Sequence, residues 1–191
     1  TIDRVDICEN GTDVYVRIID YKTGKKDFNI VKTYYGIDIQ LMVYMEAAMK
    51  LVAKMRPGKN VIPAGVFYYN ISDPIVSATT ESAEEIEDKI KGELRLKGMV
   101  NSDKDIAEKM DNTEGTSLNI PVSRKADGGF DSRRSKVMNT EQFNMLGRFV
   151  DVRAVDTADR IAGGDIRRSP YKDGQFSSCD RCPYGAVCGF S

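Results

Sequence analysis

Two side chains that could act together in a chemical site lie two positions apart near the end of the segment Val14 to Lys22. Residues of this segment alternate with the two-residue period of a β-strand, and Asp20 and Lys22 continue the face that carries Val14. A carboxylate and an ammonium group therefore project side by side. Gly24 ends the strand shortly afterwards, so we expect the pair at its carboxyl end, exposed to solvent as functional groups often are. The pair alone could also be a surface ion pair, which contributes little to stability.

A second strand is expected immediately upstream. Residues 1–7 have the composition of a strand, and the Asn10-Gly11 turn would join them to the first strand as a hairpin. Asp3 shares the apolar face of this strand with Val5 and Ile7, where an ionised carboxylate is costly unless a cation or a hydrogen-bond donor meets it. We therefore expect a partner of that kind at Asp3.

A helix is expected downstream, from Tyr34 or Ile37 to Met55. Gln40 and Tyr44 are four residues apart and so share one face of this helix. They lie beside an apolar stripe that consists of Leu41, Met45, Ala48, Val52 and Met55. Polar tips next to a core-facing stripe indicate a buried site.

These segments resemble a known protein family. The resemblance is to the RecB-like branch of the PD-(D/E)xK nucleases, and it rests on three segments: TIDRVD with Asp3, IIDYKTG with Asp20 and Lys22, and YYGIDIQLMVYMEA with Gln40 and Tyr44. The last segment, SPYKDGQFSSCDRCPYGAVCGF, resembles the cysteine-rich end of AddB-type subunits of bacterial helicase-nucleases. Together these similarities cover essentially all 191 residues.

The resemblance implies an α/β fold with a restriction-endonuclease-like core, a mixed central sheet flanked by helices, and an irregular cysteine-rich tail. We expect a single nuclease domain over 1–191, with a core at 1–75, a helical extension at 80–165 and the tail at 166–191. Because the chain begins with Thr1 within a strand pattern, we expect it to be a fragment of a longer protein. The implied activity is that of a metal-dependent exodeoxyribonuclease that processes double-strand breaks for recombination, with DNA and an AddA-like helicase-nuclease subunit as partners.

The same resemblance assigns a metal site. Asp3, Asp20 and the carbonyl of Tyr21 would bind Mg²⁺, since hard divalent cations prefer oxygen ligands. Related sites also use a histidine from an upstream helix, and this chain contains no histidine. The chain by itself is therefore expected to bind the metal weakly and to cleave DNA weakly or not at all.

Three further residues receive catalytic roles from the resemblance. Lys22 would orient or deprotonate the attacking water and stabilise the pentavalent phosphate. Gln40 and Tyr44 would steady Lys22 and the phosphate backbone.

The tail contains a group of cysteines, Cys179, Cys182 and Cys188, with the spacing C-x2-C-x5-C. Thiolates at such spacing bind an iron-sulfur cluster or zinc, and three neighbouring cysteines cannot all pair in disulfides. Cys8, in the first strand, is expected to be a small buried apolar residue. The resemblance implies a 4Fe-4S cluster whose fourth ligand lies outside this chain.

Charge is distributed in local clusters, because the net charge of the whole chain is only -1. One cluster flanks the Gly128-Gly129 turn and supplies our DNA-binding candidates: Arg124, Lys125, Arg133, Arg134 and Lys136. A second group consists of Arg167, Arg168 and Lys172. Either cluster could instead be an ordinary solvated loop.

The length is enough for one α/β domain, and 41% apolar with 30% charged residues is ordinary for a soluble globular protein. No apolar run is long enough to span a membrane and no signal peptide is evident, so we expect no membrane partner and a cytoplasmic location. The remaining elements expected are a strand from Val61 to Ile71, a helix that opens with a capping box at Ser82, a short helix after Ser102, a strand near 118–122, and a long helix from Asn139 or Thr140 to Gly163.

Two alternatives to a nuclease remain open. The first is a non-catalytic DNA-binding module, in which the cysteine site fastens the tail and the carboxylates have no catalytic role. The second is a zinc-ribbon interaction domain, which does not explain Asp3, Asp20, Lys22, Gln40 and Tyr44 together. Binding of a divalent metal ion distinguishes a nuclease from the first alternative.

Overall fold

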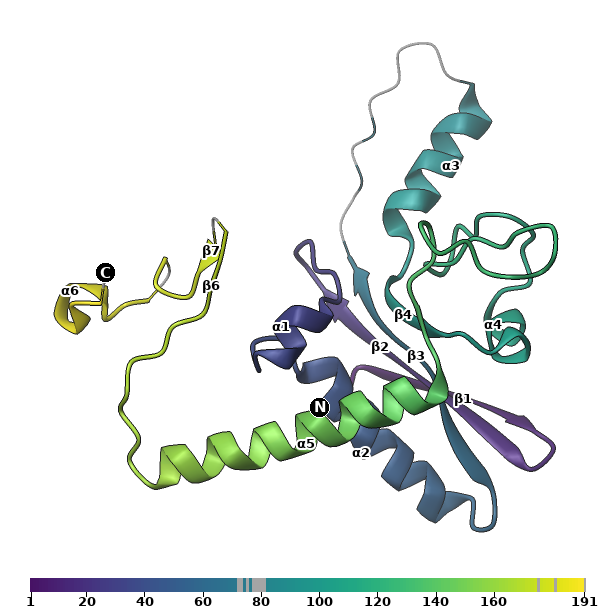
Figure 1. Ribbon diagram of the computed structural model, residues 1–191. Coiled ribbons are helices and arrows are strands. Elements are labelled where there is room, and N and C mark those ends of the chain that lie inside the picture. The colour runs from purple at the N-terminus through teal and green to yellow at the C-terminus, as the bar shows by residue number, and fades with distance from the viewer. Residues whose placement is uncertain (72–73, 75, 77–81, 175, 181, 191) are drawn as a thin grey trace. The chain divides into compact units, whose positions relative to one another are not determined.

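The computed structural model describes residues 1–71, 74, 76, 82–174, 176–180 and 182–190 (Figure 1). The chain divides into two compact units, Thr1–Asp151 and Val152–Ser191. In the part of the chain that is described, no helix is both long and apolar enough to cross a membrane.

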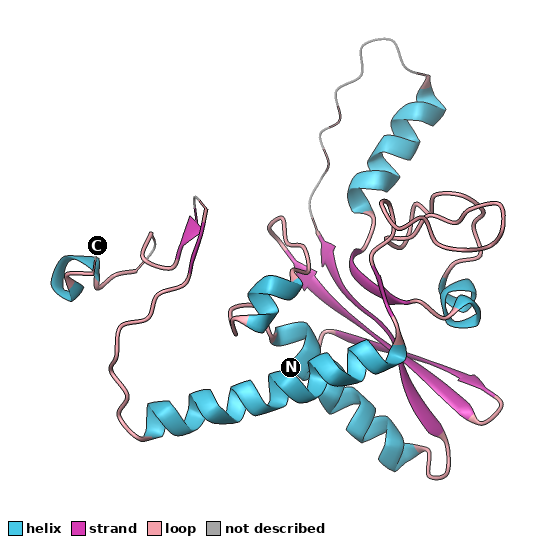
Figure 2. Cartoon of the chain, in the orientation of Figure 1, coloured by secondary structure: helices cyan, strands magenta, loops and turns pink. Residues whose placement is uncertain are grey.

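The first unit is built on a mixed sheet. Among the described residues this sheet has five strands, in the order β1-β2-β3-β4-β5. Their bounds are Arg4–Asn10, Asp13–Lys22, Asn60–Asn70, Lys97–Asn101 and Val137–Met138. The β1/β2 and β3/β4 pairs are antiparallel, whereas β2/β3 and β4/β5 are parallel. The expected mixed sheet flanked by helices is thus confirmed, and β2 and β3 end at the same edge of it (Figure 2).

The expected hairpin forms between β1 and β2. Asn10 pairs with Asp13, and Gly11 adopts φ 61°, the left-handed conformation that a tight turn requires and glycine adopts readily. The first strand was expected to include Asp3, but β1 begins at Arg4. It is an edge strand, and its apolar side chains Val5 and Ile7 are each 40% exposed.

The helix expected after the hairpin differs from the expectation. Instead of one helix from Tyr34 or Ile37, a short helix α1 (Ile30–Tyr34) precedes α2 (Gln40–Met55). Asn29 caps α1 through a hydrogen bond from the Lys32 N–H, and Gly36, with φ 79°, turns the chain between the two helices. The capping box at Ser82 is confirmed at the start of α3 (Ala83–Leu94), and the remaining helices are α4 (Lys104–Met110), α5 (Thr140–Ala162) and α6 (Gly185–Cys188).

The core has one layer on each face of the sheet. On one face, Val14, Val16 and Ile18 of β2 pack against the helix α2 (Figure 1), whose buried side chains are Leu41, Met42, Met45, Ala48 and Val52. Met55 was expected in this stripe but is 54% exposed, because α2 ends there. The opposite face is covered by residues 111–136, where Ile120 and Val122 pack on Phe67.

That covering segment is mostly irregular. The expected strand near 118–122 is absent from the described elements, and isolated bridges join Thr116 to Ser123 and Arg124 to Phe130. By contrast, β4 and β5 were not expected. Gly98 lies within β4, where an added Cβ would come 1.9 Å from the backbone oxygen of Val66. Only glycine allows the two strands to approach so closely.

The second unit, Val152–Ser191, contains the last part of α5, the two-stranded sheet of β6 (Lys172–Asp173) and β7 (Phe176–Ser177), and the one-turn helix α6. The tail was expected to have no regular structure, so these short elements correct that expectation. They are held by local turns such as the Cys182 N–H donating to the Cys179 carbonyl at 3.1 Å.

Candidate functional site

The Asp20 and Lys22 side chains lie together at the carboxyl end of β2, on the face that packs against α2. Lys22 Nζ is 2.5 Å from Asp20 Oδ2. The pair was expected to be exposed, but Asp20 is only 2% exposed because β3 and α2 enclose it. Asp20 Oδ2 is buried and has no hydrogen bond of good geometry among the described residues, so the ammonium of Lys22 compensates its charge through proximity.

Gln40 and Tyr44 extend this pair into a connected chain. Lys22 Nζ donates to Gln40 Oε1 at 3.0 Å, and Gln40 Nε2 donates to the Tyr44 hydroxyl at 2.9 Å. The first two turns of α2 and the end of β2 therefore hold the four side chains in one network. Because the amide of Gln40 is fixed at both ends, the position of the Lys22 ammonium is fixed as well.

Asp3 lies close to this network through the backbone. Its Oδ2 accepts a hydrogen bond from the N–H of Tyr21 at 2.9 Å, and its side chain is exposed in the segment that precedes β1. The expected hydrogen-bond donor for Asp3 is therefore present, as the Tyr21 N–H. Asp3 itself, however, lies before the edge strand β1 and is exposed, not on the apolar face. The oxygens of Asp3 and Asp20 have the chemistry that a hard divalent cation prefers.

These carboxylates do not form a closed metal site by themselves. Within the described ranges, no group of three or more His, Cys, Asp or Glu side chains is placed to hold a metal ion. A hard cation held by Asp3 and Asp20 would need further oxygen ligands, such as a backbone carbonyl, water or a substrate oxygen.

Three residues of the site were not identified from the sequence. Asp38, just before α2, is buried, and its Oδ1 is 2.8 Å from Lys26 Nζ and accepts a 3.4 Å hydrogen bond from the Tyr68 hydroxyl. Burial raises the pKa of Tyr68, and the neighbouring carboxylates Asp38 and Asp20 raise it further. The ammonium groups of both lysines lie over the Tyr68 ring, Lys22 Nζ at 5.6 Å and Lys26 Nζ at 5.7 Å from its centroid.

No periodic pattern could have indicated these three residues. Asp38 resembles any acidic residue near a helix start, and Tyr68 lies in an apolar strand, where its ring is part of the core. Their proximity depends on the pairing of Asp20 with Tyr68 across the parallel strands, which only the sheet register defines.

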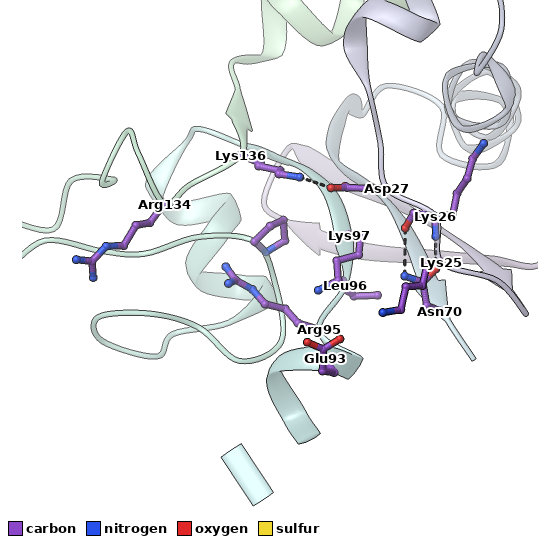
Figure 3. Close-up of a pocket in the computed structure, with 11 residues that line it drawn as sticks. Lys25, Lys26, Asp27, Asn70, Glu93, Arg95, Leu96, Lys97, Arg134 and Lys136 are labelled. Atoms are coloured by element: carbon purple, nitrogen blue, oxygen red, sulfur yellow. Dashed lines mark hydrogen bonds and ion pairs between the residues drawn. The ribbon is translucent and has the colours of Figure 1, made fainter. Parts of the chain in front are cut away.

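The five basic candidates near Gly128 separate into different environments. Arg124 donates to the carbonyls of Asp111 and Thr113, so it supports the loop. Arg134 and Lys136 line a cavity of about 390 Å³ at the edge of the sheet (Figure 3), whereas Lys125 and Arg133 are exposed and do not line it.

Asp111 organises the loop that carries these residues. Its carboxylate accepts hydrogen bonds from the Ser117 hydroxyl at 2.6 Å, the Thr113 N–H at 2.8 Å and the Asn119 amide at 2.9 Å. Burial alone would raise the pKa of Asp111, but these hydrogen bonds outweigh it and lower the pKa to about 2. The charged form of Asp111 therefore stabilises the loop.

The cysteine residues are all free thiols. Cys179 and Cys188 are half-buried and Cys182 is exposed. Cys8 was expected to be buried but is exposed, because it lies on the edge strand β1 opposite Tyr15, away from the Asp20 end of β2.

Two residues of the second basic group, Arg167 and Arg168, are engaged within the tail. Arg167 donates to both carboxylate oxygens of Asp165 at 2.9 and 2.7 Å, and Arg168 donates to the Cys188 carbonyl. These arginines therefore fold the tail locally.

Comparison with known proteins gives a consistent family. A family model described as the PD-(D/E)XK nuclease superfamily matches residues 1–189. An ATP-dependent helicase/deoxyribonuclease subunit of Thermoanaerobacter sp. (strain X514) is 39% identical over 191 residues, which are 99% of this chain and 16% of that protein. Proteins of the same name from Caldanaerobacter subterraneus subsp. tengcongensis and Clostridium botulinum (strain Hall) are 40% and 39% identical over the same shares. The chain thus spans about a sixth of the length of these relatives, and it belongs to the PD-(D/E)XK nuclease superfamily.

Proposed function

We propose that the chain is the nuclease part of a helicase-nuclease complex and hydrolyses DNA phosphodiester bonds with a divalent metal ion, Mg²⁺. The observation that supports this most directly is the connected network of Asp20, Lys22, Gln40 and Tyr44 at the end of β2. A surface ion pair would not explain a carboxylate that is buried and an ammonium that is fixed by an amide.

Asp3, Asp20 and the Tyr21 carbonyl would hold the metal ion. Their oxygens suit Mg²⁺, and the buried Asp20 Oδ2 has capacity for a further partner. When bound, the ion supplies polarisation of the scissile phosphodiester and a reactive water. Histidine is not among the ligands that this chain supplies, since the chain has none.

Lys22 would act directly on the reacting groups. As an ammonium it would orient the attacking water and stabilise negative charge that develops on the phosphate, whereas deprotonating the water would require its neutral amine. Gln40 keeps the ammonium at this position, and Tyr44 fixes the Gln40 amide so that its oxygen faces Lys22. Gln40 and Tyr44 are thus positioning residues that would also steady the phosphate backbone.

The test is cleavage of linear DNA by the intact protein after Asp20→Asn or Lys22→Ala substitution. Each variant should lose about 10³-fold or more of the Mg²⁺-dependent rate, because it removes a charge at the reacting phosphate. Lys50→Ala is a matched control, since Lys50 is also ion-paired, with Asp151 at 2.8 Å, but is exposed on α2. Cleavage at the control rate by both site variants would contradict the proposal, and DNA binding that persists without cleavage in the native protein would favour the DNA-binding module.

The wider setting is proposed from the relatives. Their name describes one subunit of an ATP-dependent helicase/deoxyribonuclease, which indicates a complex with at least one further chain. We propose that an AddA-like subunit delivers DNA ends to this site in the cytoplasm, and that the activity is exonucleolytic and serves recombination at double-strand breaks.

We also propose that Cys179, Cys182 and Cys188 bind a 4Fe-4S cluster together with a fourth ligand from elsewhere in the protein. Soft thiolates at C-x2-C-x5-C spacing support this proposal. In the intact protein, prepared without oxygen, Cys182→Ala should abolish the visible iron-sulfur absorbance, while Cys8→Ala, the matched control, should leave it unchanged. A native protein that contains zinc and no sulfide would contradict the assignment.

A further inference from the structure

The cavity that Arg134 and Lys136 line adjoins the proposed catalytic site and is strongly cationic. Among the described side chains that line it, two are carboxylates, Asp27 and Glu93, and six are cations: Lys25, Lys26, Arg95, Lys97, Arg134 and Lys136. The chain as a whole has a net charge of -1, so this concentration of positive charge is local. A cavity of about 390 Å³ with this lining is large enough for an anionic group.

Several of these cations are not neutralised by a carboxylate. Lys136 pairs with Asp27 and Lys26 with Asp38. Arg95, in contrast, uses its guanidinium on the carbonyls of Ile120 at 2.7 Å and Val122 at 3.3 Å, and burial lowers its pKa. In the described part of the chain, the ammonium of Lys25 has no carboxylate within ion-pair distance and that of Lys97 has only the Gly92 carbonyl, at 3.5 Å.

One wall of the cavity, the loop after β2, is held in place by Asn70 of β3. Asn70 is buried at the end of β3, at the position opposite Lys22 in the pairing of β2 with β3. Its side-chain amide contacts the loop after β2. Its Oδ1 accepts from the Lys26 N–H at 3.0 Å and its Nδ2 donates to the Lys26 carbonyl at 3.1 Å. This two-point contact fixes the loop that presents Lys25 to the cavity (Figure 3).

Lys26 connects the cavity to the catalytic network. It lines the cavity, and its ammonium lies over the same Tyr68 ring as the ammonium of Lys22. A polyanionic chain with one phosphate at Lys22 would therefore have a neighbouring phosphate within reach of the cavity.

We propose that this cavity binds a backbone phosphate of the DNA strand being cut, next to the scissile phosphate, and so positions the strand for cleavage. Lys25 and Lys97 supply the uncompensated charge, and Asn70 positions the loop. The inference rests on the proposed nuclease function and extends it by assigning a second phosphate site.

The experiment combines protein variants with neutral phosphates. The intact protein cleaves single-stranded oligonucleotides in which one methylphosphonate at a time replaces a phosphate on either side of a fixed cleavage position. In the native protein, one flanking position should lower kcat/KM about tenfold, as expected for loss of a charge-assisted contact. In Lys25→Ala/Lys97→Ala, the all-phosphate substrate should show this loss already, and the methylphosphonate at that position should add little.

Lys54→Ala/Lys104→Ala is the matched control, because it removes two exposed lysines that do not line the cavity. It should retain the native profile, and thermal unfolding should show that both double variants are folded. A flat profile in the native protein, as a cavity for free phosphate or nucleotide would give, overturns the proposal even though cleavage proceeds. Failure of the proposed nuclease function would give a different result. In that case the native protein would cleave none of the substrates, or Lys22→Ala would cleave them at the native rate.

Discussion

The Asp20 network and the tail cysteines are both short groups of reactive side chains, but the protein holds them in different ways. Asp20 and Lys22 lie at the end of a ten-residue strand inside a sheet, and α2 packs over them. The cysteines lie in a unit whose strands have two residues each and whose α6 has four. The comparison indicates that packing orders the first group without a ligand, whereas under our proposal ligation of the cysteines would order the second group.

The largest effect that would sharpen this comparison is expected at Gly98. Gly98→Ala places a methyl group 1.9 Å from the Val66 oxygen, so β3 and β4 must separate, and we expect a loss of about 3 kcal/mol in the free energy of unfolding. Gly185→Ala in the tail, where an added Cβ meets nothing within 4 Å, is the control for the second unit. Urea unfolding of the chain, followed by circular dichroism, measures both. Equal effects would show that the two units are equally constrained by packing.

A smaller effect is expected at Asp111. Its pKa in the folded protein is about 2, below the usual value of 3.8, so its contribution is present above pH 4 and is lost as pH falls through 2. Asp111→Asn should therefore lower the free energy of unfolding at pH 7 by about 2 kcal/mol and flatten its dependence between pH 4 and 2. An unchanged acid dependence would contradict the role given to its hydrogen bonds. Asp127→Asn, at an exposed turn of the same loop, is the control.

A smaller effect, on catalysis, is expected for Tyr44→Phe, which should lower kcat about tenfold. The substitution removes the oxygen that accepts from Gln40, so Gln40 and hence Lys22 become less fixed while the ring stays in place. Because Tyr44 acts through Gln40, KM should change little. Tyr15→Phe also removes a hydroxyl that accepts a hydrogen bond, from Asn10 at 3.2 Å, but at the other end of β2. A similar loss in both variants would indicate a general effect on the sheet.

The smallest effect is expected in the tail. Arg168→Ala removes the contact with the Cys188 carbonyl, and we expect amide hydrogen exchange in β2 and β3 to change by less than about 0.5 kcal/mol. The same experiment should show faster exchange around residues 182–188. Clearly faster exchange in β2 would mean that the tail stabilises the sheet.

Local patterns predicted much of the site because it depends on two simple periods. The two-residue alternation of β2 put Asp20 and Lys22 on one face, and the helical period put Gln40 and Tyr44 on one face of α2. The parallel pairing of β2 with β3 has no local signature, so the burial of Asp20 and its proximity to Tyr68 and Asp38 could not be predicted.

The missed strands have a similar cause. The β4 sequence KGMVN is short and contains a glycine, which favours a loop when it is considered alone. Its strand conformation comes from pairing with β3, where Gly98 avoids a backbone clash. Interactions between distant segments, which single-sequence patterns do not contain, thus define this edge of the sheet and the cavity beside it.

The edge strand β1 has a consequence for handling the protein. In the described residues no strand pairs with its outer side, and Val5 and Ile7 are partly exposed, a combination that promotes association between copies. On its other face, Asp6 pairs with Arg4 at 2.9 Å and with Arg17 at 2.7 Å. These charges oppose edge-to-edge aggregation, and since high salt screens them, concentrated samples should precipitate more readily as ionic strength rises.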